Sequence, residues 1–175
     1  MDKLTLAKEI YQISNIKGNF TLRSQQRTTE YFDKYLFEAQ PKLLFEIARQ
    51  LVALIPENID TLAGLEMGGI PIATALSLQT GIPLVFVRKK AKTYGTCKLA
   101  EGGEVKSKRI LIVEDVVTSG GAVIDAVSQL RELGAIIEQA VCVIDRESFG
   151  VENLKKIGVK LMPLFTKSYL KSSSC

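Results

Sequence analysis

The chain has 175 residues, 46% of them hydrophobic, and a net charge of +4. This length suits one domain with a sizeable apolar core, and no apolar run approaches the roughly 18 to 20 residues of a membrane span. Three cysteines are too few for a disulfide framework, and the complete lack of histidine excludes a Ser-His-Asp triad, a Cys-His pair and a histidine metal site.

We therefore expect a cytoplasmic protein of one domain, working through carboxylates, cations, backbone amides or a metal carried by a substrate. Its N-terminal part is predicted to hold two helices. Leu6, Ile10 and Ile13 recur at helical spacing, and a second such pattern follows Pro41. Between them, FTL (20–22) and YFDKYLF (31–37) indicate strands or an irregular β arm, with residues 24–30 as the loop.

Short apolar runs separated by helix-length segments fill the rest of the chain. They are TLAGL (61–65), PLVFV (83–87), ILIV (110–113) and AVCVI (140–144). This β-α-β-α alternation predicts a parallel sheet covered by helices on both faces. A last run, KLMPLF (160–165), is expected at an edge, because Pro163 cannot donate to a central ladder. Ligands of such sheets bind beyond the carboxyl ends of the strands.

The run ILIV continues as EDVVTSGGAV, which brings Glu114 and Asp115 to a strand end, ahead of a glycine turn. A helix is predicted over residues 121–133. Backbone amides of the turn, together with the helix dipole, favour a phosphate group, and paired carboxylates suit the hydroxyls of a sugar. The alternative is an ordinary capped turn with solvated acids.

Two other strand ends carry candidate groups. After PLVFV come Arg88, Lys89 and Lys92 in a polar, glycine-bearing stretch, typical of a loop that closes over an anionic leaving group, although a solvated charge run has the same composition. Gly68 and Gly69 are expected to begin a helix, either to line a pyrophosphate site or to make a tight turn.

The whole string from residue 110 to 123 resembles the phosphoribosyl pyrophosphate (PRPP) signature of type I phosphoribosyltransferases. RKKAKTYGTCKLAEGG resembles the catalytic loop of orotate phosphoribosyltransferases, and FTLRSQQRTTEYFD resembles their segment that contacts both substrates. The resemblance implies the type I α/β fold: a central, mainly parallel sheet flanked by helices, a small hood from about residues 1–40 and a mobile lid at about 92–104. The implied reaction transfers ribose 5-phosphate from PRPP to orotate, giving orotidine 5'-monophosphate and pyrophosphate in UMP biosynthesis.

The resemblance also implies roles for single residues. The catalytic residues are Lys92, Arg88, Lys89 and Asp115, with Lys92 stabilising the transition state. Arg146 offers an arginine fork to the carboxylate of orotate, although an Arg flanked by acids is more often a surface ion pair. The implied orotate contacts are Tyr31, Phe32, Thr118 and Arg146, where the aromatic pair could also be plain core. The implied PRPP contacts are Arg23, Arg88, Lys89, Lys92, Tyr94, Glu114, Asp115, Val116, Val117, Thr118, Ser119, Gly120, Gly121 and Ala122.

Three positions depart from the family pattern. Many relatives have histidine at Tyr94, glycine at Gln25 and lysine at Gly68. A tyrosine with an ordinary pKa near ~10 can donate a hydrogen bond but is a poor acid at neutral pH, so the resemblance does not carry the proton-donating role of that histidine over to Tyr94.

The implied cofactor is Mg²⁺, carried by the donor and not by a protein site. The implied assembly is a homodimer whose lid reaches the partner's site, and neither nucleic acid nor membrane is an expected partner. Two rival functions are kept. A purine phosphoribosyltransferase fits the donor motif but not Arg146 or the lid. A non-catalytic, PRPP-sensing regulator that binds nucleic acid would need a further domain or a wide basic face.

Overall fold

The structure is a computed structural model that describes residues 1–21, 25–91 and 98–173. Its main sheet has six strands in the order β5-β4-β3-β6-β7-β8. All run parallel except β5, which pairs antiparallel with β4. The strands are β3 (Thr61–Leu65), β4 (Leu84–Val87), β5 (Ala100–Glu101), β6 (Arg109–Val117), β7 (Ile136–Asp145) and β8 (Lys160–Thr166).

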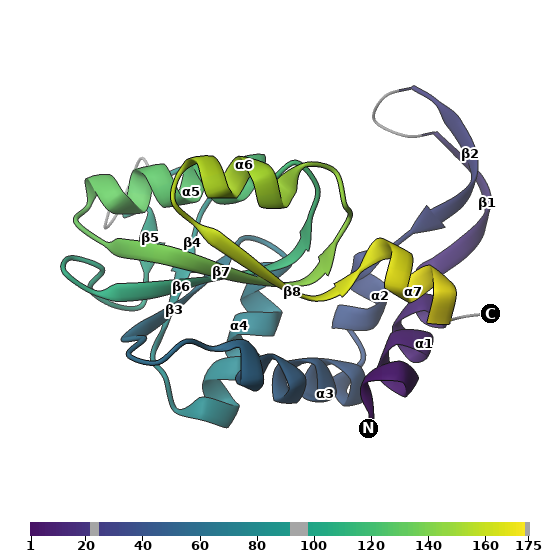
Figure 1. Cartoon of the computed structure of the whole chain (residues 1–175), viewed down its shortest axis with the longest axis horizontal. Coiled ribbons are helices and arrows are strands. Elements are labelled where there is room, and N and C mark those ends of the chain that lie inside the picture. The colour runs from purple at the N-terminus through teal and green to yellow at the C-terminus, as the bar shows by residue number, and fades with distance from the viewer. Residues whose placement is uncertain (22–24, 92–97, 174–175) are drawn as a thin grey trace.

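Helices cover both faces of this sheet, as the sequence predicts. In Figure 1, α5 and α6 lie above it and α3 and α4 below. The central strand β6 serves both layers, because Ile110 and Ile112 join the apolar cluster under α5 while Leu111 and Val113 join the one against α3 and α4. The helices are α3 (Pro41–Leu51), α4 (Gly69–Thr80), α5 (Gly121–Glu132) and α6 (Gly150–Lys156), with a 3-10 turn at Val52–Leu54.

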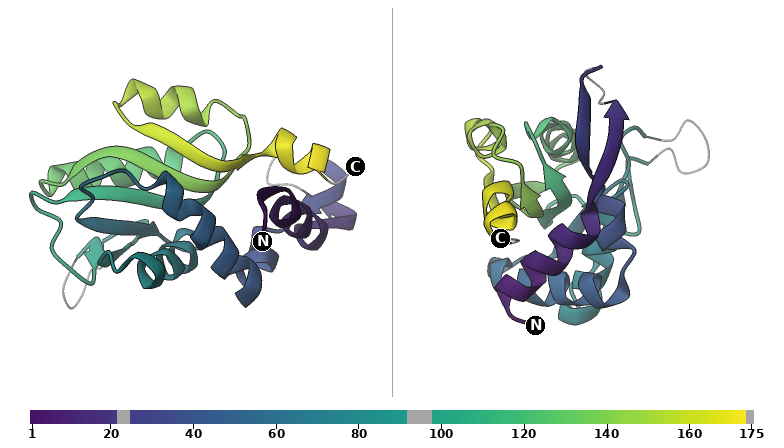
Figure 2. Two further views of the ribbon diagram at one scale, coloured as in Figure 1. Left: turned by 60° about the horizontal axis from the view of Figure 1, so that its bottom comes forward. Right: turned by 90° about the vertical axis from the view of Figure 1, so that its right-hand side faces the viewer.

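The N-terminal region stands beside the sheet together with the last helix. An antiparallel hairpin of β1 (Asn15–Thr21) and β2 (Arg27–Phe32) projects away from the sheet, as Figure 1 and the right-hand view of Figure 2 show. At its base lie α1 (Lys3–Ser14), α2 (Lys34–Glu38) and α7 (Lys167–Ser173). This arrangement matches the small hood that the family resemblance implies.

Part of the expectation for this region was wrong. The strand predicted over residues 31–37 ends at Phe32, and Lys34–Glu38 forms a helix instead. Asp33 caps that helix, because its side chain accepts a hydrogen bond from the Tyr35 amide at 3.1 Å. The predicted loop over 24–30 is also shorter, since β2 already begins at Arg27.

Other expectations are confirmed or refined. Pro41 is the first residue of α3, the predicted helix at 121–133 is α5, and β8 is an edge strand. Residues 98–104 are partly packed, since Leu99 and Ala100 are buried beside β4. Within the described ranges, no helix is long and apolar enough to cross a membrane.

Candidate active site

Two carboxylates lie at the carboxyl end of β6, in the middle of the sheet. The Asp115 side chain is completely buried and Glu114 is 8% exposed. Amides of the strand itself hold them: the Asp115 N–H donates to Glu114 Oε1 at 2.9 Å and the Val116 N–H to Asp115 Oδ1 at 2.5 Å. The acids are therefore fixed groups of the sheet and not solvated side chains.

The turn that follows has the form expected for a phosphate cradle. Gly120 has a left-handed backbone (φ 81°) that starts α5 directly, which favours glycine. Neighbouring α6 supports the turn, since Asn153 donates to the Ser119 carbonyl at 3.1 Å. Thr118, Ser119, Gly121 and Ala122 remain exposed. The first-turn amides and the dipole of α5 thus face an open position that suits an anion.

A cleft of about 540 Å³ lies between this strand end and the hood. Tyr31 and Phe32 reach it from β2, Thr118 from the turn after β6 and Arg146 from the end of β7, so the structure brings together all four predicted orotate contacts. Phe20 packs against Tyr31 with the two rings tilted by 34° and their centroids 5.5 Å apart. The other lining residues are Tyr11, Asn15, Thr28, Glu30, Asp33, Lys34, Tyr35, Val116, Ile144, Lys167, Leu170 and Lys171.

The start of α4 closes the far side of the acidic pair. A Cβ added to Gly69 would lie 2.3 Å from the Val113 carbonyl oxygen, and one added to Gly68 would lie 1.5 Å from Asp115 Oδ2. Only glycine lets the chain approach β6 this closely. Gly68 and Gly69 therefore begin a helix, as predicted, and Gly68 also packs directly against the Asp115 carboxylate.

Arg88 and Lys89 follow β4 and do not line the cleft. The Lys89 amide donates to Glu66 Oε1 at 2.9 Å, which ties the end of β4 to the loop after β3, and Arg88 lies 3.8 Å from Glu101. The remaining predicted contacts, Arg23, Lys92 and Tyr94, lie outside the described residues.

Sequence reasoning missed two site residues, Lys34 and Glu38 on α2. Lys34 forms an ion pair with Asp115, and Glu38 is a buried acid beside it. Burial, and then the neighbouring Asp115, raise the pKa of Glu38 to about 9. Their spacing of four residues places both side chains on one helix face, a signal that is visible only once residues 34–38 are known to be helical.

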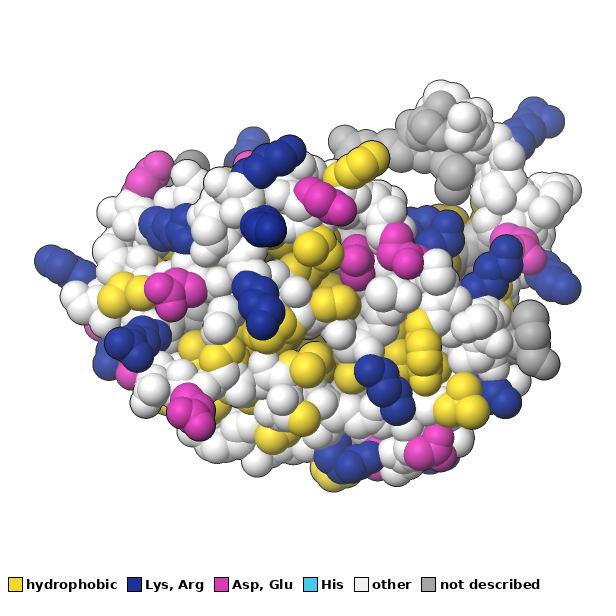
Figure 3. All heavy atoms as spheres, in the orientation of Figure 1, with side chains coloured by type: hydrophobic (Ala, Val, Ile, Leu, Met, Phe, Trp, Pro, Cys, Tyr) yellow, Lys and Arg dark blue, Asp and Glu magenta, His cyan; other side chains and the backbone are white. Residues whose placement is uncertain are grey.

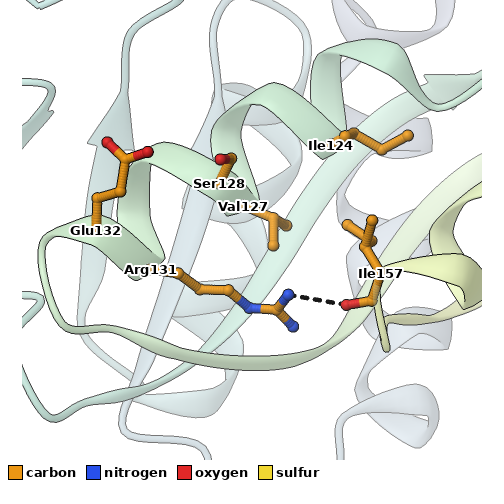
Figure 4. Close-up of a pocket in the computed structure, with 6 residues that line it drawn as sticks. All are labelled: Ile124, Val127, Ser128, Arg131, Glu132 and Ile157. Carbon is orange, nitrogen blue, oxygen red and sulfur yellow. Dashed lines mark hydrogen bonds between the residues drawn. The ribbon is translucent and has the colours of Figure 1, made fainter.

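A second hollow, of about 480 Å³, lies beside α5 and is shown in Figure 4. Its arginine, Arg131, donates to the Ile157 carbonyl at 2.8 Å and also to the Ile137 carbonyl. Because these contacts join α5 to neighbouring backbone, we assign Arg131 a structural role. The remaining lining residues are Ile124, Val127, Ser128 and Glu132.

Comparison with known proteins identifies the family of this chain. The family described as "Phosphoribosyl transferase domain" matches residues 36–165. An orotate phosphoribosyltransferase of Nocardioides sp. is 53% identical over 166 residues, which cover 95% of this chain and 93% of that relative. The chain belongs to the orotate phosphoribosyltransferase family.

Solved structures of the family have the same fold. The orotate phosphoribosyltransferase of Mycobacterium tuberculosis H37Rv, in complex with Fe(III) dicitrate, superposes with a TM-score of 0.88 at 28% identity and covers 97% of this chain and 99% of its own. The same mycobacterial enzyme in complex with PRPP gives a TM-score of 0.84 at 26% identity, covering 98% and 99%. This orotate phosphoribosyltransferase family member thus has the type I fold that its sequence implies.

Proposed function

We propose that this chain is an orotate phosphoribosyltransferase that transfers ribose 5-phosphate from PRPP to orotate and releases pyrophosphate, as a step of UMP biosynthesis in the cytoplasm. One observation carries the proposal: the acids of β6 and the cradle before α5 adjoin a cleft that is lined by Arg146 and an aromatic pair. The described free thiol, Cys142, suits a reducing compartment.

In the proposed reaction, the bond from the ribose anomeric carbon to the pyrophosphate oxygen breaks and a bond to the orotate ring nitrogen forms. No protein nucleophile is needed, which suits a chain without histidine. Glu114 and Asp115 accept hydrogen bonds from the ribose hydroxyls, and amides of residues 118–122 hold the 5-phosphate. The ring lies against Tyr31 and Phe32, while Arg146 binds its carboxylate.

The leaving pyrophosphate is assigned to cations near the end of β4. Arg88, Lys89 and Lys92, with Arg23 and Tyr94, are the proposed contacts, and Lys92 stabilises the negative charge that grows on the leaving group. We further propose a homodimer in which the lid at about 92–104 reaches the partner's site. The support is the resemblance of this segment to the catalytic loop of the family.

Magnesium is proposed to arrive with the donor. Among the described residues, no group of three or more histidine, cysteine or acidic side chains could hold a metal ion, and Asp115 is paired with Lys34. These residues fit a metal held by the donor's own oxygens, where it would neutralise pyrophosphate charge. Chelation of magnesium is expected to stop turnover, and unchanged rates in excess chelator would remove the metal from the mechanism.

Both rival functions have less support. A purine base has no carboxylate for Arg146. On the face shown in Figure 3, acidic side chains are interspersed among the Lys and Arg side chains, unlike the wide basic face of a nucleic-acid regulator.

The deciding experiment mixes the protein with PRPP and magnesium and follows the loss of orotate absorbance. Adenine, hypoxanthine and uracil serve as parallel base controls. Consumption of orotate alone is the expected result. Reaction of a purine or uracil alone would support the assigned PRPP site but contradict the assignment of orotate as the base. No reaction with any base, together with salt-dependent binding of RNA or DNA, would favour the regulator.

A further inference from the structure

The short helix α2 encloses the end of β6 from the side of the cleft. Lys34 pairs with Asp115 Oδ2, and the Lys34 side chain is 32% exposed while that of Asp115 is fully covered. Lys34 also lines the cleft. The ammonium group therefore lies between the buried carboxylate and the space where a ligand of the cleft would lie.

Three elements meet around the same carboxylate oxygen. A Cβ built on Gly68 would lie 1.5 Å from Asp115 Oδ2 and 3.0 Å from Glu38 Oε1, so both oxygens lie close to one point under the start of α4. Lys34 reaches this point from α2 and Asp115 from β6. Gly68 and Glu38 thus cover Asp115 on the side of α4, and Lys34 covers it on the side of the cleft.

The charges at this point need two protons to balance, because three buried acids lie beside one described cation, and burial raises the pKa values of both Glu38 and Glu114. Three acids, Glu38, Glu114 and Asp115, are buried together. Among the described residues, Lys34 is the cation that forms an ion pair with this group, through Asp115. Neither Glu38 Oε1 nor Asp115 Oδ2 accepts a hydrogen bond from a described amide or hydroxyl. If Glu38 carries a proton, its O–H can donate to Asp115, which satisfies both oxygens. The raised pKa of Glu38, at about 9, agrees with a neutral acid at pH 7.

We propose that Lys34 and Glu38 are positioning residues of the donor site, which hold Asp115 ionised and fixed so that it can accept a ribose hydroxyl. Glu38 acts as a neutral acid on the α4 side of Asp115. Lys34 acts as the counter-ion on the cleft side of Asp115, where the sugar of the donor would meet it. This inference rests on the proposed function and adds a role for α2, which the donor motif itself does not contain.

Lys34→Met tests the counter-ion. Without the ammonium, Asp115 would be a buried charge among acids and would itself take up a proton, which removes its acceptor strength. We expect the KM for PRPP to rise roughly tenfold or more, because an uncompensated buried charge is costly, and the KM for orotate to change much less. Lys34→Arg should recover most of the loss. The matched control is Lys42→Met on α3, an exposed lysine that pairs with Glu9 at 3.3 Å.

A second readout separates this role from simple loss of folding. The acid limb of kcat/KM for PRPP should move to higher pH in Lys34→Met, because Asp115 then keeps its proton longer. The charged and titratable groups around the Lys34–Asp115 pair are Asp33, Tyr35 and Glu38 from the hood and Glu114 from β6. An unshifted profile, with a normal melting temperature, would overturn the role of Lys34.

Glu38 is tested by two substitutions of similar size. Glu38→Gln keeps a hydrogen-bond donor and cannot ionise, whereas Glu38→Leu has no polar atom. If Glu38 is a neutral acid, the KM for PRPP should be lower in Glu38→Gln than in Glu38→Leu by roughly fivefold or more, because only the glutamine can donate a hydrogen bond to Asp115. Equal losses in both variants would show that an ionised Glu38 is required and would overturn its proposed state.

The same experiments separate this inference from the proposed function. Binding of PRPP with magnesium is measured by calorimetry on every variant, beside orotate turnover by the unmodified enzyme. If the unmodified enzyme binds PRPP but does not consume orotate, the proposed function fails and the Lys34 test still stands. If it consumes orotate and Lys34→Met behaves like Lys42→Met, only the inference fails.

Discussion

Arg146 is the residue on which the proposed choice of orotate as the base depends. Its backbone N–H donates to the Val117 carbonyl at 2.8 Å, which fixes the end of β7 beside the turn after β6, and its side chain lines the cleft. Arg146→Leu should lower kcat/KM for orotate roughly 10- to 100-fold, since charge-assisted hydrogen bonds contribute about 1.5–3 kcal/mol. The KM for PRPP should change by about twofold at most, because Arg146 is proposed to contact orotate and not the donor.

The assay is orotate consumption at varied concentrations of each substrate. Arg49→Leu is the matched control, because the Arg49 guanidinium pairs with Glu46 at 2.8 Å on α3, away from the cleft. A loss shared equally by orotate and PRPP would contradict the assignment of Arg146 to the base.

Gly68 makes a second prediction at this scale. In Gly68→Ala the new Cβ would lie 1.5 Å from Asp115 Oδ2, so the start of α4 must move away from the acids. We expect a cost of about 2 kcal/mol from overpacking, or roughly 4–8 °C in melting temperature for a chain of this size, together with weaker PRPP binding. In Gly121→Ala, the new Cβ meets only Ser119 Oγ at 3.9 Å, so its melting temperature should not fall. Equal melting temperatures for the two variants would contradict the packing argument.

Among whole elements, the start of α7 is tied to the segment after β7 by one acid. Glu147 Oε2 accepts hydrogen bonds from the Ser168 amide at 2.8 Å and the Ser168 hydroxyl at 2.6 Å, and α7 supplies Lys167, Leu170 and Lys171 to the cleft. Glu147→Ala removes both contacts and should loosen that wall. We expect the KM for orotate to rise roughly three- to tenfold, which corresponds to about one hydrogen bond, while the KM for PRPP is unchanged.

Steady-state kinetics with each substrate in turn measure this effect. Glu152→Ala, an exposed acid in the first turn of α6, is the control. If Glu147→Ala raises the KM for PRPP instead, α7 belongs to the donor side of the site.

How much of each element could be predicted depended on length and periodicity. The apolar runs that became β3, β4, β6 and β7 were visible because buried parallel strands are almost entirely apolar. Residues 31–37 were wrongly predicted to be a strand. The end of β2 is followed at once by a helix of five residues, and Asp33 is the only sequence signal of the boundary between them. The two-residue strand β5 is too short to have a pattern. The role of Lys34 was hidden because it exists only through a contact with distant β6.

For the molecule as a whole, the proposed dimer predicts complementation between inactive variants. Lys92→Ala removes the lid cation and Arg146→Leu the base contact, so a shared lid lets one site of each mixed dimer receive both intact residues. After unfolding and refolding together, about a quarter of all sites should be complete, as random C2 pairing requires. Turnover of the mixture that does not exceed the sum of the separate variants would argue that each lid serves its own subunit.

Stability of the whole fold should depend on pH through Glu38. Its pKa is about 9 in the folded protein, against an ordinary value of 4.5, because of burial and Asp115. Below pH 4.5, Glu38 is protonated in both the folded and the unfolded protein, so its contribution to the free energy of unfolding is fully present. As pH rises towards 9, the unfolded chain gains by releasing the proton that the folded chain keeps, so stability falls.

Glu38→Gln cannot ionise and should therefore gain stability relative to the unmodified protein between pH 5.5 and 8.5. Urea unfolding at the two pH values measures the difference, with the exposed Glu57→Gln as control. A difference between the proteins that is the same at both pH values would contradict the protonated state of Glu38.

The pairing of β6 with β7 sets Cys142 directly opposite Glu114. Burial raises the pKa of this thiol well above its ordinary value, with nearby acids adding to the shift, and no part of its side chain is exposed. In a Cys97→Ser, Cys175→Ser background, Cys142 would be the single thiol, and an alkylating reagent could reach it only when the sheet opens at the acids themselves. The rate of Cys142 alkylation would therefore report how often the sheet opens beneath the proposed donor site, and a ligand bound there should slow the alkylation as its occupancy rises.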